Sequence, residues 1–159
     1  MVELEVLGVS QAPEHHYPLV LLRHESRVLP ILVGVPEASA IQLGLMAEKT
    51  ARPMTHDLIC NLLAGLRAEV QSVTIYMLEN DTFFAHLNVE QRNPQDQVEQ
   101  VLRIDSRPSD GIAIAMRVGC PIYAAEEVMD LAAQDASILE PEDLDSGEDQ
   151  DDDEDEFEE

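Results

Sequence analysis

The sequence has 159 residues, of which 45% are hydrophobic, so one globular domain with a real core is expected. Its net charge of −24 is unevenly placed, because residues 140–159 hold 14 acidic side chains and no Lys or Arg, which leaves −10 for residues 1–139. An acidic body argues against nucleic-acid binding through a broad basic surface, since such binding rests on cations that neutralise phosphates.

Other whole-chain features place the protein in the cytoplasm. Two cysteines are too few for a disulfide framework, and residues 1–9 do not resemble a secretory signal. No apolar stretch approaches the ~18 residues of a membrane span, so no membrane association is expected. We therefore predict a cytoplasmic protein with a folded domain over residues 1–139 and a disordered acidic tail over residues 140–159.

The first half of the chain predicts strands followed by a helix. Alternating apolar residues indicate strands at residues 2–9, 19–23 and 28–33. A helix follows over about residues 37–48, and its spacing directs Ala38, Ile41 and Leu45 toward the core.

A second helix is expected over residues 55–66. Pro53 ends the preceding segment, Thr55 is a suitable N-cap, and Asp57 in the first turn complements the helix dipole. The apolar residues of this segment recur on one stripe of an amphipathic helix: Leu58, Ile59, Leu62, Leu63 and Leu66.

The second half repeats the pattern. Strands are predicted at residues 73–78, 82–91 and 98–105, and the first two form a hairpin around the turn at residues 79–81. A helix begins at Pro108 and ends at Gly119, and a short helix covers residues 126–133.

The two halves can be superposed by a shift of 73 residues. This shift places residues 28–31 on 101–104, and it places Glu37 on Asp110 at equivalent helix starts. We therefore predict an α+β fold with a mixed or antiparallel sheet, built from pseudo-duplicated β-β-β-α halves that the helix over residues 55–66 connects.

Reactive side chains gather at two junctions of the first half. Glu37 lies at a helix start, where the dipole alone favours a carboxylate, and a metal or substrate role is the alternative. His56 beside Asp57 is either a general base or metal ligand, or a side chain that hydrogen-bonds within the capping turn.

The densest polar cluster of the folded part is the strand-to-helix junction at residues 105–110. Arg107 offers a planar fork for phosphate or carboxylate, and Ser109 can cap the helix. Asp105 and Asp110 could hold a hard cation such as Mg²⁺. Alternatively, an Arg–Asp pair merely fixes the turn.

Three segments resemble the signatures of the bifunctional nuclease domain family, long catalogued as a domain of unknown function. They are LPILVG with EASAI at residues 29–41, RPMTHDL at residues 52–58 and DSRPSDGIA at residues 105–113. Further similarity at residues 120–123 and 126–128 extends the match over essentially the whole folded part. The resemblance implies an α+β fold and nuclease activity on DNA and RNA.

On this resemblance, we predict a nuclease, a hydrolase that uses divalent Mg²⁺ or Mn²⁺. Glu37, Asp105 and Asp110 would hold the metal. His56, oriented by Asp57, would act as the catalytic acid or base together with Asp110. Arg52 and Arg107 would bind the nucleic-acid phosphates.

The alternative is a non-catalytic interaction module. In that case the polar motifs are capping devices on a symmetric scaffold, and they mark a binding or oligomer surface; a homo-oligomer is expected. The acidic tail would then keep the protein soluble or bind a basic protein.

Overall fold

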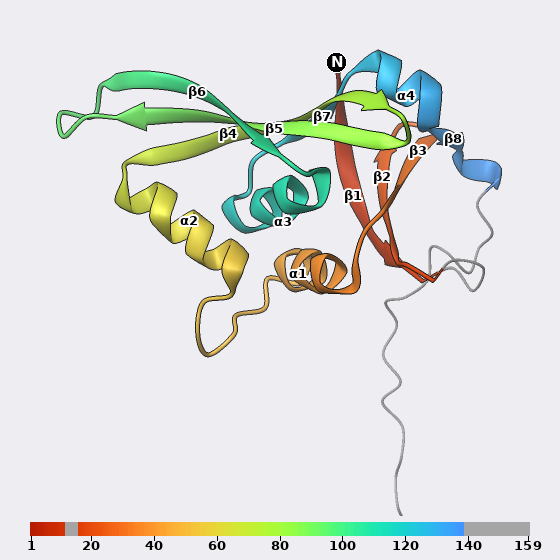
Figure 1. The fold of residues 1–159 in the computed structure, drawn as a ribbon, viewed down its shortest axis with the longest axis horizontal. Coiled ribbons are helices and arrows are strands. Elements are labelled where there is room, and N and C mark those ends of the chain that lie inside the picture. The colour runs from red at the N-terminus through yellow and green to blue at the C-terminus, as the bar shows by residue number, and fades with distance from the viewer. Residues whose placement is uncertain (12–15, 139–159) are drawn as a thin grey trace, which may run out of the picture.

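A computed structural model describes residues 1–11 and 16–138 (Figure 1). The predicted acidic tail at residues 140–159 lies outside the described residues. The strands are β1 Val2–Ser10, β2 Leu19–His24, β3 Arg27–Leu32, β4 Ala68–Glu79, β5 Thr82–Arg92, β6 Val98–Ser106, β7 Ile122–Ala124 and β8 Gln134–Asp135. The helices are α1 Val35–Leu45, α2 Thr55–Gly65, α3 Pro108–Val118, α4 Glu126–Ala132 and the 3-10 helix η1 Ala136–Ile138.

The strands form one mixed sheet, and this confirms the predicted α+β class. Its order is β6-β5-β4-β7-β1-β2-β3-β8, and all pairs are antiparallel except β4 with β7. Each half runs strand, strand, strand, helix, and α2 connects them as predicted. Both bounds of α1 map onto those of α3 after the 73-residue shift.

The β4–β5 hairpin forms where the alternation predicts it, and its turn explains the tight reversal. Asn80 and Asp81 have φ of 49° and 58°, a left-handed conformation that these two residue types tolerate better than most. Cross-strand pairs then run from Glu79 with Thr82 to Ala68 with Gln91. The long strands of this hairpin extend away from the rest of the molecule, and β6 pairs with β5 as the edge strand of the sheet (Figure 1).

The core lies between the sheet and its helices. Ile41 of α1 and Ile112 of α3 are fully buried, as are Val73 and Ile75 of β4. Figure 1 shows α2 and α3 beneath the β4–β5 hairpin and α1 below α3, where α1 packs against α3 and β1; α4 packs separately against β3 and β4. The starts of α1, α2 and α3 are thereby brought together. No helix of the described chain is long and apolar enough to cross a membrane.

Four local predictions are wrong. Met54, not Thr55, is the N-cap of α2. Asp57 accepts a hydrogen bond from the Met54 amide, and Thr55 is already the first residue of the helix. Arg107, not Ser109, is the N-cap of α3. The first helix ends at Leu45 rather than at residue 48, and Leu45 is 38% exposed because it lies in the fraying last turn.

Helix α2 also departs from the expected pattern. Ile59 and Leu63 pack against the core, but Leu58, Leu62 and Leu66 of the same predicted stripe are more than half exposed. The stripe is wider than the surface that the sheet and α3 offer to it, so only one edge of it is covered.

Candidate active site

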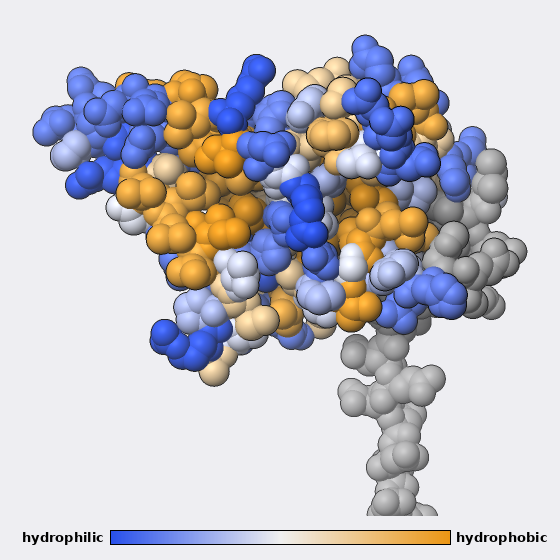
Figure 2. Space-filling view, in the orientation of Figure 1, coloured by the Kyte–Doolittle hydropathy of each residue, from blue (hydrophilic) through white to orange (hydrophobic). Residues whose placement is uncertain are grey.

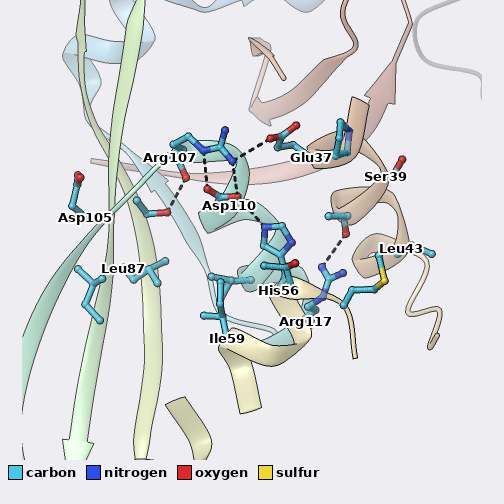
Figure 3. A pocket seen from close by; sticks show the side chains of 17 residues that line it. Glu37, Ser39, Leu43, His56, Ile59, Leu87, Asp105, Arg107, Asp110 and Arg117 are labelled. Carbon is cyan, nitrogen blue, oxygen red and sulfur yellow. Dashed lines mark hydrogen bonds and ion pairs between the residues drawn. The ribbon is translucent and has the colours of Figure 1, made fainter. Parts of the chain in front are cut away.

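A pocket of about 780 Å³ lies where α1, α2 and α3 meet β5 and β6 (Figure 3). Its polar side chains come mainly from the starts of the three helices and from the end of β6, and apolar side chains from the sheet and from all three helices complete the lining. The residues that line it are Pro36, Glu37, Ser39, Ala40, Leu43, Met54, Thr55, His56, Ile59, Leu87, Ile104, Asp105, Ser106, Arg107, Asp110, Ile114 and Arg117.

Arg107 holds two carboxylates from the two halves of the chain. Its Nε donates to Asp110 Oδ2 at 2.8 Å, and its Nη2 donates to Glu37 Oε1 at 3.1 Å and to Asp110 Oδ1 at 3.2 Å. The hydrogen bond to Asp110 raises the pKa of Arg107, because it stabilises the charged guanidinium. The side chain is nevertheless 64% exposed, so the cation also faces solvent at the pocket.

His56 joins this cluster from α2. Its Nε2 lies 2.9 Å from Asp110 Oδ1, and its side chain is only 12% exposed. Burial alone would raise the pKa of Asp110, but the hydrogen bonds from Arg107 and His56 outweigh burial and lower it. Asp110 therefore stays ionised between two donors. Asp57 is the residue predicted to orient His56, but the hydrogen-bond partner of His56 in the structure is Asp110.

Asp57 points to the other side of α2, where it binds Arg117. Its Oδ1 accepts from Arg117 Nε at 2.8 Å, and its Oδ2 accepts from the Met54 amide at 2.9 Å. The Met54 amide and Arg117 both stabilise the charged carboxylate, so the pKa of Asp57 is lowered. Arg117 Nη1 also donates to the carbonyls of Ala40 and Ala113, and this one guanidinium ties the three helices together.

Two glycines make room for these side chains. The Glu37 carboxylate folds back over Gly34 and fills the space that a Cβ would need there. A Cβ at Gly44 would lie 2.9 Å from Arg117 Nη1 and 2.9 Å from the Cβ of Met116. Glycine at both positions therefore permits the close approach of α1 to the site.

Comparison with known proteins shows the family to which this α+β domain belongs. The family model described as "Bifunctional nuclease domain" matches residues 19–137. The chain belongs to the bifunctional nuclease domain family. Two uncharacterised proteins of Mycobacterium tuberculosis, from strains CDC 1551 and H37Rv, are each 40% identical to it over 147 residues, which cover 91% of this chain and 82% of theirs.

This bifunctional nuclease domain brings four of its predicted site residues into direct contact: Glu37, His56, Arg107 and Asp110. Asp105 lines the pocket but lies apart from that cluster in Figure 3. Arg52 is exposed in the loop before α2 and does not line the pocket. The two predicted phosphate-binding arginines are therefore not equivalent, and only Arg107 lies in the pocket.

The predicted divalent metal does not fit the side chains as they are arranged. Glu37 and Asp110 converge on the Arg107 guanidinium, and that cation already fills the position between the two carboxylates. Among the described residues, no three His, Cys, Asp or Glu side chains form a group that could hold a metal ion. A divalent ion would have to displace Arg107, and the metal dependence stays a prediction.

Arg117 belongs to the site but was not predicted from the sequence. It is 12% exposed and follows an apolar run at residues 112–116. A cation in such surroundings requires a carboxylate partner, because a buried charge without one is costly. This rule predicts from the sequence that Arg117 has a carboxylate partner. It does not predict that the partner is Asp57.

Proposed function

We propose that this pocket is the active site of a nuclease, which hydrolyses the phosphodiester bonds of DNA or RNA. The observation that supports it is the side-by-side placement of an exposed cation and a His–Asp pair. Arg107 presents its guanidinium to the pocket while Asp110 binds both Arg107 and His56. Phosphoryl transfer needs both elements, a cation on the phosphate oxygens and a group that moves a proton.

Each residue has a specific role in the proposed reaction. Nη1 of Arg107 has no hydrogen-bond partner among the described residues, so this edge of the guanidinium is available to a phosphate oxygen. One ring nitrogen of His56 is held by Asp110, and the other takes the proton of the attacking water as the new P–O bond forms. The P–O bond to the leaving sugar oxygen breaks in the same displacement, and that oxygen takes a proton from solvent water. Glu37 fixes the orientation of Arg107 through Nη2.

The acidic body restricts how the substrate can bind. The described cations near the pocket are few, and Arg117 is occupied by Asp57 and two carbonyls. We expect weak binding that depends on one phosphate at Arg107, with a shallow dependence of affinity on salt, because few counterions are released.

A specific observation favours the alternative, a non-catalytic interaction module. Every buried polar side-chain atom of the described residues already has a hydrogen-bond partner, as in a cluster that serves folding alone. In that case His56 and Arg107 contribute to stability, and their replacement changes no chemical rate.

The test is cleavage of labelled single-stranded DNA and RNA by the purified full-length protein, with Mg²⁺, with Mn²⁺ and with EDTA. His56→Gln and Arg107→Gln should each lower the rate by roughly 100-fold or more. His86→Gln and Arg103→Gln are matched controls, because both residues lie outside the pocket lining, and both should retain wild-type rates. Equal rates in His56→Gln and the wild type would exclude the proposed site.

A further inference from the structure

Helix α2 carries an exposed apolar ridge. Four residues spaced by four, beginning at its N-cap, form this α2 ridge: Met54, Leu58, Leu62 and Leu66. They are 50%, 52%, 56% and 61% exposed. No residue of α2, all of which the structure describes, is buried. An isolated helix of this length is only marginally stable in water, so a helix without buried residues is expected to pack against something further.

The ridge is continuous and points away from the core. Residues four apart lie on neighbouring turns of one helix face, so the four side chains follow one another along that face. Ile59 and Leu63, on the adjoining face, make the contacts with the core. In Figure 2 the apolar surface gathers over the position that α2 occupies in Figure 1. Its extent exceeds that of the isolated exposed leucines normal on a protein surface.

The ridge also lies in an uncharged part of the sequence. Residues 58–66 contain no Asp, Glu, Lys, Arg or His, although the chain carries a net charge of −24. Most of the surface of such a chain repels another copy, and a basic partner would be drawn to that acidic surface rather than to this ridge. At the α2 ridge, two copies can approach with the uncharged residues 58–66 of one facing those of the other.

We infer that the α2 ridge is the apolar centre of an interface with a second copy of this chain, related by a two-fold axis. A row of side chains at i, i+4 and i+8 is self-complementary, because the ridge of one helix fits the groove beside the same ridge of another. An interface of ordinary size buries about 800 Å² on each partner, with the apolar residues at its centre and polar residues around them. Met54 belongs both to the ridge and to the pocket lining, so the interface adjoins the active-site pocket.

The test is the mass of the full-length protein in solution by light scattering and sedimentation at about 1 to 100 µM. We expect twice the 17.7 kDa chain mass for the wild type. Leu62→Glu should shift the protein to monomer, with at least a 100-fold weaker dimer. Leu131→Glu is the matched control, because Leu131 is an equally apolar, 70% exposed leucine on α4, and it should leave the dimer intact.

Two further measurements separate the interface from a folding defect. Leu62 is exposed, so Leu62→Glu should keep the wild-type far-UV circular dichroism; the milder Leu62→Asn should weaken the dimer at least 10-fold. Added salt should strengthen the wild-type dimer, because it screens the repulsion between two acidic chains. A monomeric wild type at 100 µM, or a dimer equally weakened by Leu62→Glu and Leu131→Glu, would overturn the inference.

Discussion

Helices α2 and α3 have the same length of 11 residues and lie side by side, yet they are held in different ways. Seven residues of α3 are buried, whereas α2 buries none. Two polar contacts join α2 to α3, His56 with Asp110 and Asp57 with Arg117. The site is therefore built by one helix fixed in the core and a second helix that is held against it by these two polar contacts and by the partly buried Ile59 and Leu63.

The largest expected difference is in the free energy of unfolding that is lost when one apolar side chain is truncated in α3 or in α2. Ile112→Ala in α3 should lower the free energy of unfolding by about 2–5 kcal/mol, because Ile112 is fully buried and the change leaves a cavity. Leu62→Ala in α2 should change it by less than about 0.5 kcal/mol in the dilute monomer. Urea unfolding of both variants measures the difference, and equal losses would show that α2 is covered by its own chain.

The contact between the helices is tested by removing its cation. Arg117→Met should lower the free energy of unfolding by roughly 2–3 kcal/mol, because Asp57 and two helix carbonyls lose a largely buried donor. Hydrogen exchange should quicken in α2 more than in α3. Arg103→Met, at an exposed arginine, is the control and should change neither quantity. An equal increase of amide hydrogen exchange in α2 and α3 of Arg117→Met would contradict the claim that Arg117 holds α2 against α3.

A smaller effect is expected where α1 approaches the site. Gly44→Ala should destabilise the protein by about 1 kcal/mol, because the new methyl group would press on Arg117 and Met116 and so cost more than the gain in helix propensity. Gly65→Ala is the matched control, since nothing lies within 4 Å of a Cβ at that position. Thermal melts should show Gly44→Ala below wild type and Gly65→Ala at or above it.

The smallest effect is the dependence of stability on pH. The folded-state pKa values of Asp57 and Asp110 are lowered, so the unfolded chain binds more protons in acid. Their contribution is complete above the ordinary carboxyl pKa of about 4 and is lost as the pH falls through the folded values. Asp57→Asn removes part of this dependence, and its melting temperature should drop by roughly 2 °C less than that of the wild type between pH 6 and pH 3. Parallel curves would show that Asp57 does not contribute.

Much of the fold follows from local patterning, and the site follows only in part. Alternation predicts the β4–β5 hairpin, and Pro108 with Gly119 predicts both ends of α3. The 73-residue shift predicts that Glu37 and Asp110 occupy equivalent positions, and both bind Arg107. The three-residue strand β7 is too short to show a period, and its parallel pairing with β4 is not readable from spacing.

The partners of the charged residues are tertiary facts. His56 is adjacent to Asp57 in the sequence, but consecutive residues on a helix point about 100° apart, so it binds Asp110 from another helix. Likewise the leucines of α2 show an apolar stripe, yet the sequence does not show how much of that stripe the rest of the chain covers. Sequence motifs point to Glu37, His56, Asp105, Arg107 and Asp110, which all line the pocket, but the contacts among these side chains are visible only in the structure.

The central claim is that His56 and Asp110 act together on a phosphodiester bond. A double-mutant cycle on kcat/KM for RNA and DNA cleavage tests it directly, with the wild type, His56→Gln, Asp110→Asn and the double variant. If the two side chains form one catalytic unit, each single change should lower kcat/KM nearly as far as the double change does. Effects that simply multiply, or rates that all equal the wild type, would contradict the account.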